Sequence, residues 1–191
     1  MKRRAGERDL TDGLVDSWRR EKPELERPEY AVARRAVRLG VLLEETLNAA
    51  LVPWNLTKTD FAVISALRLV GAPYELRPSD LKNRLLITSG GVTTVLKRLE
   101  RADLIEREQD TVDGRSSWVR LTRTGVETAD ATMETWSEAE SRFFREVPPE
   151  VTRAASEALR EVMIAVGDLE PPLAQAGKRR ARSAPEALTS P

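Results

Sequence analysis

The 191-residue chain contains no cysteine and no histidine, and its 31 basic and 31 acidic side chains cancel to a formal net charge of zero. Without thiols and imidazoles the chain lacks disulfides, the usual metal ligands and the usual general base, so we expect no metal, no cofactor and no enzymatic activity. No apolar run reaches the ~18 residues that span a bilayer. The N-terminal segment also lacks the apolar stretch of a secretion signal, which predicts a cytoplasmic protein without a membrane partner.

Three helices are expected before the middle of the chain. A short one, Leu10 to Arg20, ends before two prolines and carries Trp18, which we expect to pack this helix onto the body of a dimer. The next, Tyr30 to Val52, is amphipathic at the 3.6-residue period. The third, Thr57 to Val70, opens on a Thr57-x-x-Asp60 variant of the capping box.

Residues 77–102 have the pattern of two helices joined by a tight turn. Pro78 and Asp80 suit the first turn of a helix, where the missing N–H of proline is harmless and a carboxylate complements the helix dipole. The apolar face of this first helix is predicted to hold Leu81, Leu85 and Leu86. Thr88 or Ser89 is expected to cap the second helix, which runs to Ala102.

The second helix has one apolar and one polar face. Helical spacing predicts that its core face consists of Val92, Val95, Leu96, Leu99 and Ala102. The opposite face is predicted to bind DNA through Ser89, Gly90, Thr93, Thr94, Lys97, Arg98 and Arg101. Hydroxyls and long cations on one helix face suit the major groove, and glycines at the helix start permit close approach to a phosphate. The alternative is a passive solvated surface.

Two strand-like segments follow directly, Leu104 to Arg107 and Ser117 to Leu121. The Asp113-Gly114 pair between them is a strong signal for a tight turn. Arg115 is therefore expected at the tip of a two-stranded wing, where a cation can enter a narrow minor groove. Asp113 has the alternative role of a plain turn former.

This order of elements resembles the MarR family of bacterial transcription regulators. The resemblance covers about residues 30 to 168, and its most specific features are Asp113-x-Arg115 in the wing and the closing LTRTG, which is similar to the family's L-T-x-x-G. It implies that Arg115 enters the minor groove, that Asp113 orders the wing, and that the helix from Thr88 to Ala102 is the recognition helix. The chain departs from the family at Gly114, where a second basic residue is frequent, and at Asp103, where glycine is usual.

The expected fold is mainly α with a small β-wing. A winged helix-turn-helix domain would span 57–125, a helical dimerisation region 30–56 and 126–170, an N-terminal extension 1–29 and a disordered tail 171–191. The helices around the reading domain have apolar faces without an obvious partner, which favours a homodimer that reads a palindromic operator in double-stranded DNA. The alternative is that all the helices pack into one monomer.

The resemblance also implies a small aromatic or phenolic effector. Candidate ligand-binding residues are Trp18, Trp54, Phe61 and Arg84. A tryptophan at a helix junction is more often part of the core than a ligand wall, so core packing is the competing interpretation. The urate-responsive branch of the family has an aspartate where this sequence has Ala62, which argues against urate.

We therefore expect a sequence-specific transcription regulator, a repressor, released by a small ligand. Two alternatives belong to other classes of function. One is an architectural protein that binds DNA of any sequence, and the other is a helical dimer used for protein interaction only. Comparison of binding to native and unrelated DNA distinguishes the three.

Overall fold

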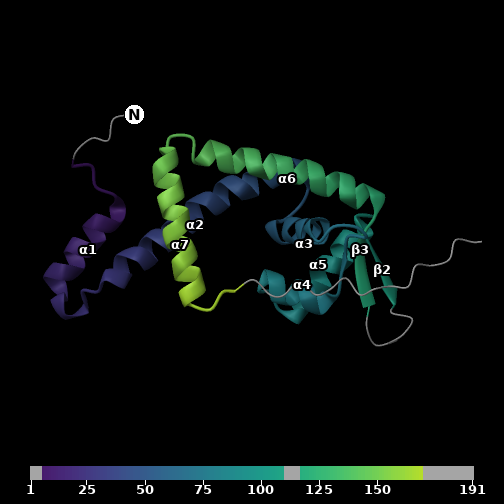
Figure 1. Cartoon of the computed structure of the whole chain (residues 1–191), viewed down its shortest axis with the longest axis horizontal. Coiled ribbons are helices and arrows are strands. Elements are labelled where there is room, and N and C mark those ends of the chain that lie inside the picture. Colours follow the sequence, from purple (N-terminus) through teal and green to yellow (C-terminus); the bar gives the residue numbers. More distant parts are fainter. Residues whose placement is uncertain (1–5, 110–116, 170–191) are drawn as a thin grey trace, which may run out of the picture. The chain divides into compact units, whose positions relative to one another are not determined.

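The computed structural model describes residues 6–109 and 117–169 (Figure 1). Helices dominate, and their bounds are α1 Leu10–Glu21, α2 Pro28–Leu51, α3 Lys58–Leu69, α4 Pro78–Leu85, α5 Ser89–Arg101, α6 Arg123–Phe143 and α7 Pro149–Ala165. The strands are β1 Glu75–Leu76, β2 Ile105–Gln109 and β3 Ser117–Leu121. Short 3₁₀ turns occupy Pro23–Leu25 and Val52–Trp54. The predicted fold class, mainly α with a small β-wing, is confirmed.

The described residues form two compact units. One comprises the chain up to Lys58 together with 131–160, and it holds α1, α2, the C-terminal part of α6 and most of α7. The other comprises 59–130 and the residues from Glu161 onward, and it holds α3, α4, α5 and the sheet. The second unit contains the helix-turn-helix and is called the reading unit below.

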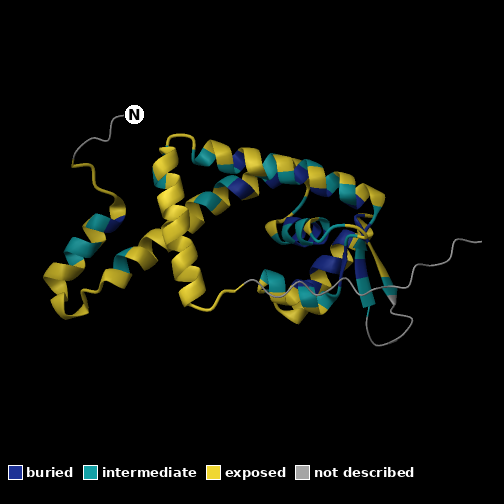
Figure 2. Ribbon diagram, in the orientation of Figure 1, coloured by how far each residue is buried: buried dark blue, intermediate teal, exposed yellow. Residues whose placement is uncertain are grey.

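The core of the reading unit is made by α3, α4 and α5. Its most deeply buried members include Val63, Ile64, Leu67, Leu81, Val92, Leu96 and Leu99, which are at most 3% exposed. They occupy one face of each helix, as the dark segments in Figure 2 show. The core face predicted for α5 is confirmed at Val92, Val95, Leu96 and Leu99, whereas Ala102 is exposed because it forms the C-cap.

Leu86 does not lie in the core, and the prediction that placed it there was wrong. It is 83% exposed, whereas Leu81 of the same helix is completely buried. The helix ends at Leu85, and Leu86 takes the left-handed conformation of a C-cap, with φ 52°. That backbone turn directs the side chain away from the face on which helical spacing would have put it.

The sheet has three strands in the order β1-β3-β2, and both pairings are antiparallel. Strand β3 has the expected bounds, β2 overlaps the expected Leu104 to Arg107 but starts one residue later and ends two residues later, and β1 was not predicted. Its two residues are too few to show an alternating pattern, and they pair with β3 so that Glu75 lies opposite Arg120. The Arg120 Nε donates to Glu75 Oε2 at 3.3 Å, which adds a cross-strand ion pair to the sheet.

The LTRTG segment joins the sheet to α6 through three hydrogen bonds around Thr122. Its hydroxyl donates to the Asp103 carbonyl at 2.7 Å and accepts from the Gly125 N–H at 2.9 Å, while its own N–H donates to the Leu104 carbonyl at 3.1 Å. A Cβ on Gly125 would overlap the Leu104 carbonyl oxygen. The segment therefore uses a hydroxyl side chain at its second position and requires glycine at its fifth.

Asp103 adopts φ 57°, the left-handed region that favours glycine. Since this is the position where the chain departs from the family's usual glycine, we expect Asp103→Gly to stabilise the reading unit by about 0.5–1 kcal/mol. A rise in the thermal midpoint, followed by circular dichroism, would show this. Asp103→Ala, which keeps the strain of a Cβ, is the matched control and should give no rise.

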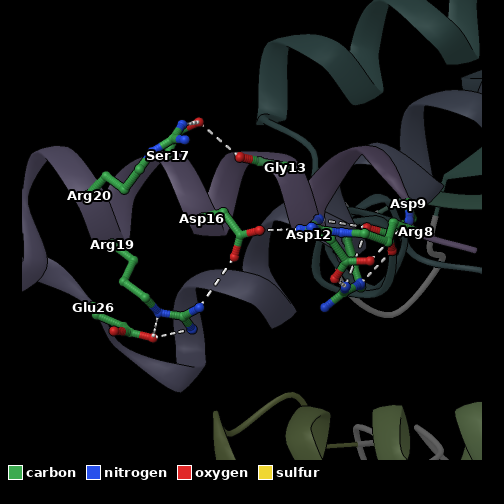
Figure 3. Close-up of polar contacts among 10 residues, drawn as sticks. Arg8, Asp9, Asp12, Gly13, Asp16, Ser17, Arg19, Arg20 and Glu26 are labelled. Atoms are coloured by element: carbon green, nitrogen blue, oxygen red, sulfur yellow. Dashed lines mark hydrogen bonds and ion pairs between the residues drawn. The ribbon is translucent and has the colours of Figure 1, made fainter. Parts of the chain in front are cut away.

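In the other unit, α1 is held to α2 by charged side chains at its start (Figure 3). Asp9 caps the helix by accepting from the Asp12 N–H at 2.9 Å, and the Asp12 carboxylate accepts from the Asp9 N–H at 3.0 Å. Arg35 of α2 donates to both carboxylates, at 2.7 Å from Nε to Asp9 Oδ2 and from Nη2 to Asp12 Oδ1. Its hydrogen bond lowers the pKa of Asp9.

Two further pairs brace the same helix. Arg8 pairs with Asp16 and lowers the pKa of that carboxyl, and Arg19 donates to Glu26 Oε1 at 2.6 Å and lowers the pKa of Glu26. The Trp18 ring meets Tyr30 of α2 edge to face, with centroids 5.8 Å apart. Trp18 therefore packs α1 onto α2 within one chain, and its role in packing the extra helix onto the body of a dimer stays a prediction.

Because Asp9, Asp16 and Glu26 have lowered pKa values, their pairs stabilise the folded unit above the ordinary pKa near 4 and are lost as the pH falls through the folded values. We expect α1 to loosen below about pH 4, before α5 does. Amide NMR resonances of α1 should then move toward random-coil positions while those of α5 stay in place. Simultaneous movement of both helices would contradict this order.

Candidate nucleic-acid interface

The start of α5 is fixed by a side-chain cap. Thr88 is the N-cap, and its Oγ1 accepts from the Gly91 N–H at 3.1 Å. A Cβ on Gly91 would come within 3.2 Å of that same oxygen, so glycine there protects the cap. Within residues 6–109 and 117–169 a Cβ on Gly90 would meet nothing within 4 Å, so packing among these residues does not require that glycine.

The polar face of α5 is exposed, because the apolar face is anchored in the core. The exposed residues include all those predicted to bind DNA from this helix, namely Ser89, Gly90, Thr93, Thr94, Lys97, Arg98 and Arg101. Charge is distributed unevenly along the face. Residues 89–96 carry no charged side chain, whereas Lys97, Arg98 and Arg101 follow in the second half.

The two threonines of this face direct their hydroxyls to their own helix. Thr93 Oγ1 donates to the Ser89 carbonyl at 3.0 Å, and Thr94 Oγ1 donates to the Gly90 carbonyl at 3.1 Å. Each hydroxyl proton is thereby used in a hydrogen bond within the helix. Both side chains are exposed, and each also carries a methyl group on its Cβ.

Arg98 has a partner inside the protein. Its Nε donates to Asp60 Oδ1 at 2.8 Å and to Oδ2 at 3.0 Å, and its Nη2 donates to Oδ1 at 2.6 Å. Asp60 is 1% exposed, whereas 46% of the Arg98 side chain is exposed. The pair therefore ties α5 to α3 and leaves part of Arg98 at the surface. Sequence reasoning missed it, because Asp60 was assigned to a helix cap and no local pattern links residues 38 positions apart.

Ion pairs and a stacking contact hold the base of the wing together. Arg120 lies among three carboxylates, with Nη2 2.7 Å from Glu108 Oε2, Nη1 3.6 Å from Glu106 Oε1, and the contact to Glu75 already described. Arg77 stacks over the Trp118 ring at 4.8 Å from its centroid.

Asp113 and Arg115 lie outside the described residues, and so does the predicted tail 171–191.

The four candidate ligand residues are divided between the two units. Trp18 and Trp54 belong to one and Phe61 and Arg84 to the other. Phe61 is 8% exposed and part of the core, whereas Trp18 and Trp54 are 39% and 37% exposed. An open cavity of about 450 Å³ is lined by Met133, Glu134, Ser137 and Glu138 and by none of these four.

Among residues 6–109 and 117–169 no group of three or more carboxylates is placed to hold a metal ion. No helix in the same ranges is long and apolar enough to cross a membrane.

Comparison with known proteins agrees with this geometry. A model of the MarR family matches residues 54–116. The chain is 32% identical over 112 residues to the HTH-type transcriptional regulator PecS of Dickeya dadantii (strain 3937), covering 59% of this chain and 68% of PecS.

Solved structures share the fold at lower identity. AbsC, a MarR family transcriptional regulator from Streptomyces coelicolor, superposes with a TM-score of 0.66 at 24% identity and covers 76% of this chain and 98% of its own. A mutant of MarR from E. coli, complexed with operator DNA, gives 0.63 at 20% identity and covers 82% and 99%. The organohalide-sensing regulator RdhR-CbdbA1625, bound to 2,4-dichlorophenol, gives 0.65 at 18% identity and covers 76% and 85%.

Proposed function

Since the chain belongs to the MarR family of transcription regulators, which are DNA-binding proteins and not enzymes, we propose that it represses transcription. In this proposal it acts as a homodimer that reads a pseudo-palindromic operator. The observation that carries the proposal is the exposed polar face of α5, positioned by four buried residues and a threonine cap. A helix of this kind fits the major groove. The wing is proposed to bring Arg115 to the minor groove, with Asp113 ordering its turn.

Dimerisation is supported by apolar side chains that the single chain leaves uncovered. Exposed members of α7 and the residues just after it are Leu159, Val162, Met163, Ile164, Val166 and Leu169, each at least 43% exposed. Apart from Val151, which is intermediate, α7 is drawn in the yellow of exposed residues in Figure 2. Contiguous exposed apolar surface of this kind marks an interaction site, and a closed two-fold dimer is the commonest way to bury it. Sedimentation of the purified protein tests the dimer.

A small aromatic or phenolic effector is proposed by analogy with RdhR-CbdbA1625, whose structure holds 2,4-dichlorophenol. Trp18, Trp54, Phe61 and Arg84 remain the candidate ligand residues. Release of bound DNA on addition of phenolic acids or chlorophenols would support this part of the proposal, and an unchanged affinity across such a panel would contradict it.

The decisive experiment is a salt-titrated binding assay. It compares the DNA upstream of the protein's own coding region with a scrambled fragment of equal length. We expect the native fragment to bind at least ~10³-fold more tightly. Equal binding to both would favour the architectural alternative, and absence of binding to either at any salt concentration would favour a dimer used for protein interaction only.

Two variants separate the roles of helix and wing. Arg115→Ala should weaken binding to all sequences. It should also lower the salt slope, which is the dependence of the logarithm of the binding constant on the logarithm of the salt concentration, by about one unit, because one cation close to the DNA phosphates is lost. Lys97→Ala should relax preference at one base position at a cost of about 1–3 kcal/mol, if the lysine contacts a guanine. Arg123→Ala, which removes an exposed cation of α6 paired with Glu127, is the control. Unchanged binding by both test variants would refute the residue assignment.

A further inference from the structure

We propose that Thr93 and Thr94 read thymine, by placing their methyl groups against the C5-methyl groups of thymine bases in the major groove. This inference rests on the proposed DNA-binding function and adds to it the class of base that the first half of α5 selects. Three observations on the reading unit carry it: the direction of the hydroxyl groups, the distribution of charge along α5, and the open side of Gly90.

The first observation is the pair of hydrogen bonds within the helix. Thr93 and Thr94 donate their hydroxyl protons to carbonyls four residues earlier, at 3.0 and 3.1 Å. A hydroxyl engaged in this way cannot donate to guanine O6 or N7, or to thymine O4, unless the internal bond breaks. Its oxygen can still accept, and the methyl group remains available. Since a threonine methyl contacts the thymine methyl favourably, the displayed surface selects thymine.

The second observation is the absence of charge from residues 89–96. Recognition helices contact base edges mainly through their N-terminal residues. Guanine is read most often by arginine or lysine, and those side chains begin only at Lys97. The first half of α5 therefore lacks the groups that read guanine but keeps two that can read thymine.

The third observation concerns Gly90. A Cβ there would meet nothing within 4 Å, so no contact within the described part of the chain explains the glycine. Glycine in a helix is less favourable than alanine by roughly 0.5–1 kcal/mol. Because Gly90 has no side chain, the α5 backbone beside Thr93 and Thr94 can come close to the DNA, which allows the two threonines to contact a base.

The test removes the methyl from the DNA rather than from the protein. The full-length protein first selects its tightest duplex from a random pool. Each thymine of that duplex is then replaced by uracil, which lacks only the C5-methyl. We expect about a fourfold loss of affinity at each contacted thymine, since burial of one such group contributes ~0.8 kcal/mol and 1.4 kcal/mol corresponds to tenfold.

Protein variants assign the effect to these side chains. Thr93→Ser and Thr94→Ser keep the hydroxyl and lose the methyl, so each should weaken binding to the thymine duplex about as much as uracil does. In the double serine variant the uracil replacement should have no further effect. Thr93→Val and Thr94→Val keep a methyl and should bind within twofold of wild type. Thr152→Ser, an exposed threonine of α7 with the same kind of internal bond, is the matched control.

The outcomes are distinct. Uracil sensitivity that disappears in the serine variants supports the inference. A selected duplex that is insensitive to uracil at every position, or a loss with valine as large as with serine, overturns it while leaving sequence-specific binding intact. Failure to select any duplex overturns the proposed function itself.

Discussion

Gly125→Ala should destabilise the reading unit by about 3 kcal/mol, the largest effect we expect from a single methyl group in this protein. The added Cβ would overlap the Leu104 carbonyl oxygen and lie 2.9 Å from its carbon and 3.2 Å from Leu121 Cδ2. The carbonyl cannot move aside freely, because it accepts the Thr122 N–H. Relief of the overlap therefore requires β2 and α6 to separate.

Thermal unfolding followed by circular dichroism would measure the effect. Gly90→Ala is the matched control, because it adds the same atom to the same unit where nothing lies within 4 Å, and it should leave stability unchanged or slightly raised. A Gly125→Ala protein as stable as this control would show that the start of α6 adapts, contrary to our account.

The second large effect is expected at the Asp60–Arg98 pair. Arg98→Ala would leave a carboxylate that is 1% exposed without three of its hydrogen bonds, and we expect a loss of about 2–4 kcal/mol. Arg98→Lys should recover little, since one ammonium group cannot reproduce the two-pronged guanidinium geometry. In Asp60→Ala/Arg98→Ala the losses should be less than additive by about 1–3 kcal/mol, whereas strict additivity would show that the pair is not coupled.

The same variants address the predicted contact of Arg98 with DNA. If the exposed part of Arg98 also reaches a phosphate, its replacement should lower the salt slope of binding by about one unit. If Arg98 only holds α5 on α3, the slope should stay constant while the affinity falls with the loss of folded protein. Lys97→Ala, one position earlier, supplies the comparison for a cation without an ion-pair partner in the described part of the chain.

Local patterns predicted most of the reading unit. The buried face of α5 and the burial of Leu81 in α4 follow from spacing along single helices, and such spacing is visible in a sequence. Residue type placed the cap of α5 at Thr88 or Ser89, and Thr88 is the one that caps. The wing strands follow from β-branched residues on either side of a turn signal. Membership in the MarR family, first indicated by the LTRTG motif, agrees with these elements.

Features that depend on the third dimension were not predictable. β1 exists because its two residues meet β3, and nothing within Glu75–Leu76 signals a strand. Leu86 fits the helical spacing of α4, yet the helix ends one residue before it. The Asp60–Arg98 contact joins two helices across 38 positions of sequence, so that an arginine predicted only as a DNA contact ties α5 to α3.

The strand order carries a consequence for solubility. A sheet with open edges can pair with another copy of itself and grow into aggregates. Here the well-formed strand β3 lies in the centre, one edge is only two residues long, and the other edge, β2, carries Glu106, Arg107 and Glu108. A short edge and a charged edge both resist edge-to-edge pairing. The sheet edges are thereby protected from polymerisation, and the proposed dimer contact falls to the helices.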